Sequence, residues 1–221
     1  MASVFLIVAI SYLVGSFPTS IILARITRQI DIRNFGSGNA GGTNAFRVLG
    51  WKSGLFVALV DLGKGAFTTL VISEIRVDEV VLNHETIQII AGISAVIGHI
   101  WTIMAKLKGG KGVATAGGMV IALHPWAALA CVVVFFIAVA LSRYVSVGSI
   151  TAAASLPLNL LILSKFFDKP VTNTFLFSSV MIGSLIIFTH RENIRRLLDG
   201  KENRFGKSDL APKPEDIRHA G

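Results

Sequence analysis

The chain has 221 residues, of which 52% are hydrophobic and only 15% are charged, and its net charge is +8. Soluble domains carry about 25% charged residues, so this composition excludes an ordinary soluble protein and indicates a membrane protein. Nucleic acid is not the expected partner, because no basic face with interleaved aromatic residues lies outside the apolar segments. The single cysteine, Cys131, lies in an apolar run without metal-ligand neighbours, so we expect a packing residue.

Six apolar runs are each about 17–21 residues long, enough to cross a bilayer as a helix. They cover residues 4–24, 53–73, 87–105, 126–142, 147–164 and 172–189. The first run lacks a basic segment before it and a convincing cleavage site after it, so we interpret it as a membrane helix and not as a signal peptide. We predict one all-α integral membrane domain over residues 1–208 and a disordered tail over residues 209–221.

The basic residues of the loops predict the orientation of this bundle. Lys and Arg residues follow the first run, stand again between positions 106 and 111, and recur beyond position 190, whereas the loop at 74–85 is acidic. We therefore expect the three basic segments in the cytoplasm, with the N-terminus outside and the C-terminus inside.

This orientation requires an odd number of crossings. The short apolar segment Val113–Leu123 ends at His124-Pro125, where proline breaks a helix. It spans roughly 17 Å, about half the hydrocarbon core, so it supplies a seventh helix if its N-terminus begins in a protein-lined cavity below the membrane surface. The alternative is a six-helix chain with its basic tail outside.

The first polar segment, GSGNAGGTNAFR at residues 36–47, combines glycines with neutral donors and an arginine. Glycines permit positive φ, and successive N–H groups in such a loop bind anions. Arg47 adds a planar fork suited to phosphate. We interpret the segment as a phosphate-binding loop, and a flexible polar linker is the alternative. The candidate residues are Gly36, Ser37, Gly38, Asn39, Thr43, Asn44 and Arg47.

The second polar segment, KGGKGVAT at residues 108–115, lies directly before the short helix. A helix N-terminus presents free N–H groups and a positive dipole, so such a segment binds phosphate. It is not a Walker A loop, because Ala105 stands where that motif needs glycine. An ordinary basic loop is the alternative, but the glycine spacing favours binding. The candidate residues are Gly109, Gly110, Lys111 and Gly112.

The third polar segment, HRENIRRLLDGKE at residues 190–202, predicts an amphipathic helix that leaves the last crossing. His190 and Asn193 are three residues apart and share a face. A solvated interfacial helix explains the arginines, but not a histidine at the membrane boundary. The connection RYVS at 143–146 lies on the same side and adds Ser146.

Two charged residues lie inside a crossing. Asp61 and Lys64 are at i, i+3, and a charge near a helix centre costs about 2.5–3.5 kcal/mol on insertion scales. A structural ion pair and a site lining fit them equally. His99, near the end of the third run, fits an interface anchor or a pocket wall.

Covalent and metal chemistry are not indicated. No histidine has an aspartate five residues later, as common glycerolipid acyltransferases require, and G-x-S-x-G is absent. No His and Cys spacing indicates a metal site, so we expect no cofactor.

The three polar segments together resemble the motifs of one family, the acyl-phosphate-dependent glycerol-3-phosphate acyltransferases of bacteria (PlsY). GSGNAGGTNAFR matches the first motif, GH at 98–99 followed by KGGKGVAT matches the second, and HRENIRRLLDGKE matches the third. Gly42, Thr102 and Leu107 depart from the family's usual alanine, proline and phenylalanine, but none of these changes removes a polar group.

The resemblance implies transfer of a fatty acyl group from acyl phosphate to the sn-1 hydroxyl of glycerol 3-phosphate. It implies a seven-helix inner-membrane enzyme that faces the cytoplasm and is functionally linked to the enzyme that makes acyl phosphate from acyl carrier protein. It also implies that Ser37 and Arg47 are needed for activity, that the glycine loop binds glycerol 3-phosphate, that His190 and Asn193 support catalysis, and that Glu202 is structural.

Our hypothesis follows from these roles. Ser37, Asn39, Asn44 and Arg47 hold the acyl phosphate, and Lys111 is shared between the two phosphates. Gly109, Gly110 and Gly112 offer N–H groups to glycerol 3-phosphate, with Ser146 and Asn193 nearby. The general base is either His190 or a substrate phosphate oxygen. The competing classes are a transporter for a phosphorylated solute and a structural scaffold.

Overall fold

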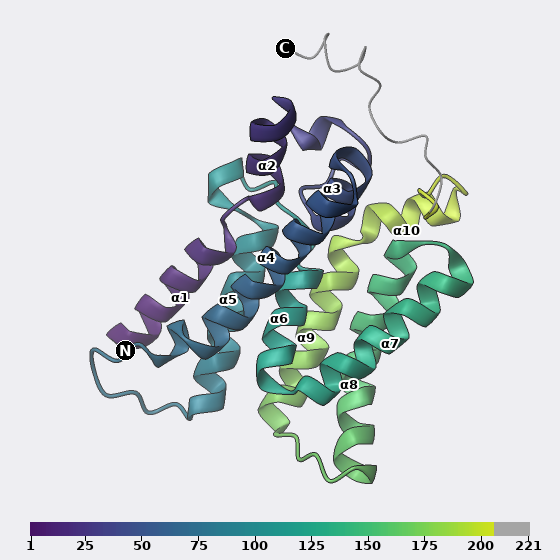
Figure 1. Cartoon of the computed structure of the whole chain (residues 1–221). Coiled ribbons are helices and arrows are strands. Elements are labelled where there is room, and N and C mark those ends of the chain that lie inside the picture. The colour runs from purple at the N-terminus through teal and green to yellow at the C-terminus, as the bar shows by residue number, and fades with distance from the viewer. Residues whose placement is uncertain (206–221) are drawn as a thin grey trace.

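The computed structural model describes residues 1–205, and this part of the chain is helical without strands (Figure 1). The α-helices are α1 (Ala2–Gly15), α2 (Thr19–Arg28), α3 (Gly42–Leu49), α4 (Trp51–Leu70), α5 (His84–Ile100), α6 (Val113–Leu123), α7 (Pro125–Ser142), α8 (Val145–Phe166), α9 (Asn173–Thr189) and α10 (Arg191–Leu198). Three short 3-10 helices are η1 (Ile32–Asn34), η2 (Ile72–Glu74) and η3 (Ile103–Ala105). The tail expected over 209–221 lies outside the described residues.

The all-α membrane bundle is confirmed. Within residues 1–205, five helical stretches are long and apolar enough to cross a membrane, and α9 with α10, which meet at 54°, make a sixth if they count as one span. The apolar helix α6 is shorter and has the bounds expected from the sequence. The seventh crossing and the orientation of the termini stay predictions.

The first crossing is not the continuous helix that we expected over residues 4–24. Helix α1 ends at Gly15 and α2 begins at Thr19, because Pro18 between them cannot donate a backbone hydrogen bond. The buried Lys64 on α4 forms hydrogen bonds with polar groups at this break. Its ammonium donates to the Phe17 carbonyl at 2.5 Å and to Thr19 Oγ1 at 2.8 Å. Lys64 also pairs with Asp61 at 2.7 Å, so the two form a structural ion pair.

Glycine residues on α4 and α6 allow these two helices to pack closely. A Cβ on Gly65 would lie 1.9 Å from the Thr115 carbonyl oxygen, and one on Gly118 would lie 1.9 Å from the Leu62 carbonyl oxygen. Backbone contact of this kind is the usual way in which membrane helices associate closely. It fixes where the N-terminus of the short α6 lies within the bundle.

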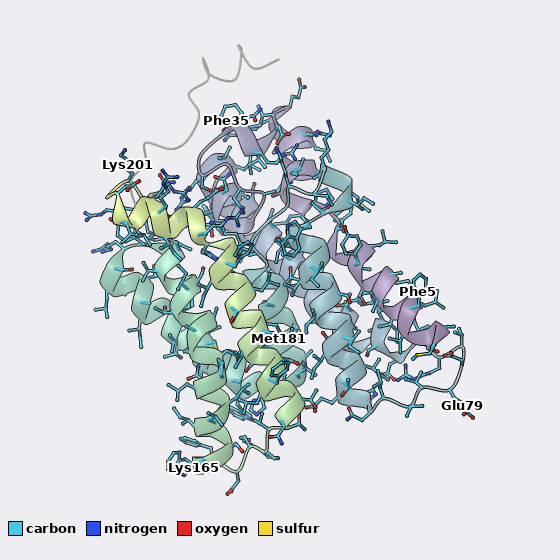
Figure 2. All side chains as sticks on the ribbon, turned by 180° about the vertical axis from the view of Figure 1, so that it is seen from behind. Phe5, Phe35, Glu79, Lys165, Met181 and Lys201 are labelled. Carbon is cyan, nitrogen blue, oxygen red and sulfur yellow. The ribbon has the colours of Figure 1, made fainter. Side chains whose placement is uncertain are left out.

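The polar segments lie together at one end of the bundle. In Figure 1, α2, α3 and α10 share the end opposite to the N-terminus. Figure 2 shows the same division from behind, with Phe35 and Lys201 at one end and Glu79 and Lys165 at the other. The chain connections that carry candidate site residues therefore converge.

We predict that Gly118→Ala destabilises the protein, because its methyl group would meet the α4 backbone at 1.9 Å. Overpacking of this kind costs about 1–3 kcal/mol, which lowers the midpoint of thermal unfolding by several degrees in detergent. Gly117→Ala is the matched control, since nothing lies within 4 Å of its added Cβ. Equal midpoints for the two variants would contradict the close α4–α6 contact.

Candidate active site

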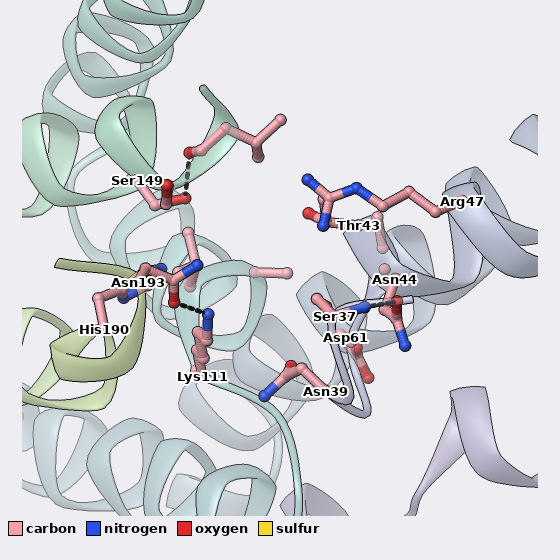
Figure 3. Close-up of a pocket in the computed structure, with 18 of the residues that line it drawn as sticks. Ser37, Asn39, Thr43, Asn44, Arg47, Asp61, Lys111, Ser149, His190 and Asn193 are labelled. Carbon is pink, nitrogen blue, oxygen red and sulfur yellow. Dashed lines mark hydrogen bonds between the residues drawn. The ribbon is translucent and has the colours of Figure 1, made fainter. Parts of the chain in front are cut away.

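A cavity of about 200 Å³ lies among these polar segments (Figure 3). Its polar lining consists of Ser37, Asn39, Thr43, Asn44, Arg47, Asp61, His99, Lys111, Ser146, Ser149, His190, Asn193 and Glu202. These residues come from all three motif segments, from α4 and α5, and from the start of α8. The sequence-based expectation that the segments form one site agrees with this arrangement.

One wall is the loop that precedes α3. Gly36 and Gly38 have φ values of +62° and +72°, which turn the chain without bringing either glycine into the lining. The buried Asn44 fixes this turn: its Oδ1 accepts from Ser37 N–H at 2.8 Å, and its Nδ2 donates to the carbonyls of Ile32 and Phe35 at 3.1 Å. Asn44 lines the cavity and also shapes this loop through its own hydrogen bonds, and its expected contact with the substrate stays a prediction.

Arg47 is the positively charged residue of this wall. Thr43 and Arg47 are four residues apart on α3, so both point into the cavity (Figure 3). Burial lowers the pKa of the Arg47 guanidinium from its usual value. Within residues 1–205 it forms no salt bridge, and its contact with the Asn203 carbonyl oxygen is long, at 3.5 Å.

The opposite wall is the N-terminus of α6. Gly112 is the N-cap with φ +84°, and no side chain in the described range caps the helix. Gly112, Val113 and Ala114, the N-cap and first two residues of α6, line the cavity, so the positive end of the helix lies at it. Next to it, Lys111 Nζ donates to Asn193 Oδ1. Burial lowers the pKa of Lys111 to about 8, and repulsion from Arg196 adds to this effect.

Gly109 and Gly110 do not have the role expected from the sequence. The Gly109 N–H donates to the Ile100 carbonyl and the Gly110 N–H to the His99 carbonyl, each at 3.0 Å. These bonds satisfy the last carbonyls of α5. Neither glycine lines the cavity, so they anchor the loop and do not offer N–H groups to a ligand there.

The third motif surrounds Lys111 with an ordered network. Glu202 Oε1 accepts from Asn193 Nδ2 at 2.7 Å and from Ser146 Oγ at 3.0 Å, and Glu202 Oε2 accepts from Arg196 Nε at 2.7 Å. Burial would raise the pKa of Glu202, but the hydrogen bonds from Asn193 and Arg196 outweigh it and lower the pKa. The carboxylate thereby orients the Asn193 amide, whose oxygen faces Lys111.

His190 is buried where α9 meets α10. Its Nδ1 lies 2.8 Å from the Ile186 carbonyl oxygen, which can only accept, so Nδ1 carries the proton. The neutral ring then has a lone pair on Nε2. This tautomer is the one that can accept a proton from a ligand in the cavity.

Sequence reasoning did not single out Ser149 or Phe135 on the α7–α8 side. Ser149 follows Ser146 by three residues on α8, and this spacing is the signal that places both on the cavity face. Phe135 gave no signal, because it lies within a uniformly apolar helix. Among the described residues, no group of three His, Cys, Asp or Glu side chains is placed to bind a metal ion.

Comparison with known proteins agrees with this site. The profile of the family described as "Glycerol-3-phosphate acyltransferase" matches residues 5–200. Glycerol-3-phosphate acyltransferase of Chlorobium phaeobacteroides strain BS1 is 45% identical over 228 residues, which cover 92% of this chain and 97% of the relative. The enzyme of the same name from Chlorobaculum parvum is 45% identical over 224 residues, covering 91% of this chain and 97% of the relative.

Two solved structures have the same fold. The glycerol 3-phosphate form of PlsY (YgiH), an integral membrane glycerol 3-phosphate acyltransferase, has a TM-score of 0.80 and 38% identity over 93% of this chain and 96% of that chain. The lysophosphatidic acid form has a TM-score of 0.78 and 37% identity over the same shares. Fold, motifs and near-complete coverage agree, and this chain therefore belongs to the glycerol-3-phosphate acyltransferase family of integral membrane enzymes.

Proposed function

We propose that the chain transfers a fatty acyl group from acyl phosphate to the sn-1 hydroxyl of glycerol 3-phosphate. The products are 1-acylglycerol 3-phosphate and inorganic phosphate. The observation that carries this proposal is the pair of cations, Arg47 and Lys111, on opposite walls of one cavity. Within residues 1–205 neither forms a salt bridge, so both are available for anions.

Two separate cations suit two substrates that each carry a phosphate. Glycerol 3-phosphate brings one. A thioester donor has no anionic oxygen at its reacting carbonyl, whereas acyl phosphate has a phosphate one bond away from it. The second cation therefore supports acyl phosphate as the donor. It also favours departure of that phosphate, because positive charge stabilises the leaving group in the transition state.

The two walls differ in what they offer each phosphate. Ser37, Asn39 and Arg47 lie on one side and bind the acyl phosphate. The N-terminus of α6, Asn193 and Ser146 lie on the other and bind glycerol 3-phosphate. Lys111 lies next to Asn193, across the cavity from Arg47 (Figure 3), and is shared between the two phosphates. This wall has the features of a phosphate site at a helix N-terminus.

The reaction follows from this placement. The sn-1 oxygen attacks the acyl carbonyl carbon, a new C–O ester bond forms, and the bond from that carbon to the phosphate oxygen breaks. The hydroxyl proton passes to His190 Nε2, and the leaving phosphate departs towards Arg47. Because the mixed anhydride already has a good leaving group, orientation of the two substrates supplies much of the acceleration, about 7–11 kcal/mol in well-aligned systems.

The location of the enzyme is part of the proposal. The cavity lies at the end of the bundle that carries most of the basic loop residues, and such residues remain on the cytoplasmic side. This supports an enzyme of the bacterial inner membrane with its N-terminus outside and its cavity facing the cytoplasm. There it would receive acyl phosphate from the enzyme that makes it from acyl carrier protein.

We predict that Arg47→Ala lowers the rate of lysophosphatidate formation by about 10²–10³, the usual cost of losing a group that stabilises developing charge. Purified protein in lipid is assayed with acyl phosphate and labelled glycerol 3-phosphate. Arg25→Ala, at an exposed position on α2, is the matched control and keeps full activity. Wild-type protein that is folded but forms no product would refute the proposed reaction.

The Lys111 ammonium predicts an alkaline limit to activity. Its pKa near 8 means that the charged form predominates below pH 8 and is lost above it. We expect kcat/KM for glycerol 3-phosphate to fall as the pH rises through about 8 in the wild type. Lys111→Arg keeps its charge at that pH, so its residual activity should not show the same fall. An identical alkaline limb in both proteins would assign the titration to another group.

His190 as general base predicts a large loss on substitution. His190→Ala should lower kcat by about 10²–10⁴, the usual contribution of general base catalysis. In the wild type, kcat should fall at acid pH because protonation of His190 removes the base. This fall should be absent in His190→Ala, since no imidazole remains to be protonated. Near-normal turnover with an unchanged pH dependence would instead give the proton to a substrate phosphate oxygen.

A further inference from the structure

His99 separates the reaction cavity from the glycine loop that carries Lys111. Its ring lines the cavity, and also a second cavity of about 10 Å³ bordered by Gly109 and Gly110. A Cβ on Gly110 would lie 2.0 Å from His99 Nε2, and the three nearest atoms all belong to this ring. The loop residue next to Lys111 is therefore packed directly on the imidazole.

The backbone of His99 contacts the same glycine. The His99 carbonyl oxygen accepts from the Gly110 N–H at 3.0 Å, so Gly110 is fixed by both the ring and the main chain of one residue. Earlier in this loop, Lys106 and Leu107 have φ values of +57° and +61°. Residues other than glycine are strained in this region and adopt it only where surrounding contacts determine it. The bond from the Leu107 N–H to the Thr102 carbonyl oxygen, at 2.9 Å, is one such contact.

Asp61 and Lys64 support the ring from α4. His99 Nδ1 lies 3.6 Å from Asp61 Oδ1, which is too long for a hydrogen bond but close enough to orient the imidazole dipole. Asp61 is 2% exposed and its charge is matched by Lys64 at 2.7 Å. The pair is neutral overall, so this support adds no net negative charge next to the phosphate site.

The ring is not placed for proton transfer. Its Nε2 lies against Gly110 and its Nδ1 lies 3.6 Å from Asp61 Oδ1, so each ring nitrogen is next to a protein group. The contacts of His99 are those of a support for the loop. They distinguish it from His190, whose Nε2 carries a lone pair and has no hydrogen-bond partner within residues 1–205.

We propose that His99, oriented by Asp61, is a positioning residue that fixes Gly110 and thereby sets the place of Lys111 in the cavity. This inference rests on the proposed role of Lys111 in binding glycerol 3-phosphate. It assigns to the histidine of the second motif an effect on the acceptor substrate and not on the acyl donor.

A double-mutant cycle tests whether His99 acts through Lys111. KM and kcat for both substrates are measured in lipid for the wild type, His99→Ala, Lys111→Ala and the double variant. We expect His99→Ala to raise KM for glycerol 3-phosphate about tenfold or more, with little change in KM for acyl phosphate. In the Lys111→Ala background the same change should add less than about threefold. Ser94→Ala, a buried change elsewhere on α5, is the control and leaves both constants unchanged.

Gly110→Ala approaches the same contact from the loop and keeps the inference testable if His99→Ala does not fold. It should also raise KM for glycerol 3-phosphate selectively. An unchanged KM in either folded variant, equal effects on both substrates, or full additivity with Lys111→Ala would overturn the positioning role. Failure of Lys111→Ala itself to raise this KM would refute the proposed phosphate site instead, so the two failures are distinguishable.

Discussion

Arg47 and Lys111 face one cavity from opposite walls, and the surrounding charges are arranged so that both cations stay available. An ionised group that is taken out of water is normally paired with an opposite charge. Here the two carboxylates that line the cavity already have structural partners: Asp61 pairs with Lys64, and Glu202 with Arg196. Within residues 1–205, the two remaining cations form hydrogen bonds to neutral oxygens, those of Asn203 and Asn193. Phosphate groups are the ligands that we propose for this site.

The packing of the helices also places positive charge at the cavity. Close contact through Gly65 and Gly118 positions α6 so that its uncapped N-terminus opens into the cavity beside Lys111. The break between α1 and α2 gives Lys64 a carbonyl to bind, which helps to explain why a buried lysine is tolerated on α4. Irregular backbone within a membrane protein occurs where protein or a cavity surrounds it. The N-terminus of α6 lines the site, and the break between α1 and α2 lies beside Asp61 and His99, which also line it.

Much of the fold could be predicted from the sequence, because the length of an apolar run and the charge of a loop can be read from neighbouring residues. The apolar runs predicted most of the spans, and the short apolar segment before His124-Pro125 predicted α6 with its observed bounds. The convergence of the polar segments followed from their common side. Contacts between segments were not predictable in the same way. Nothing in the sequence shows that Asn44 is used by its own loop, or that the N–H groups of Gly109 and Gly110 are taken by α5. Pro18 was a local signal for the break, but the apolar run around it has the length of one helix.

The assignment of one phosphate to each wall can be tested most directly in a crystal structure with both substrates represented. Glycerol 3-phosphate and a non-reactive acyl phosphonate would be bound together to the whole chain in lipid. The account predicts two phosphorus atoms in the same cavity, one at the N-terminus of α6 and one at Arg47, with Lys111 between them. A single phosphorus site, or two sites on the same wall with Arg47 in contact with neither, would contradict it.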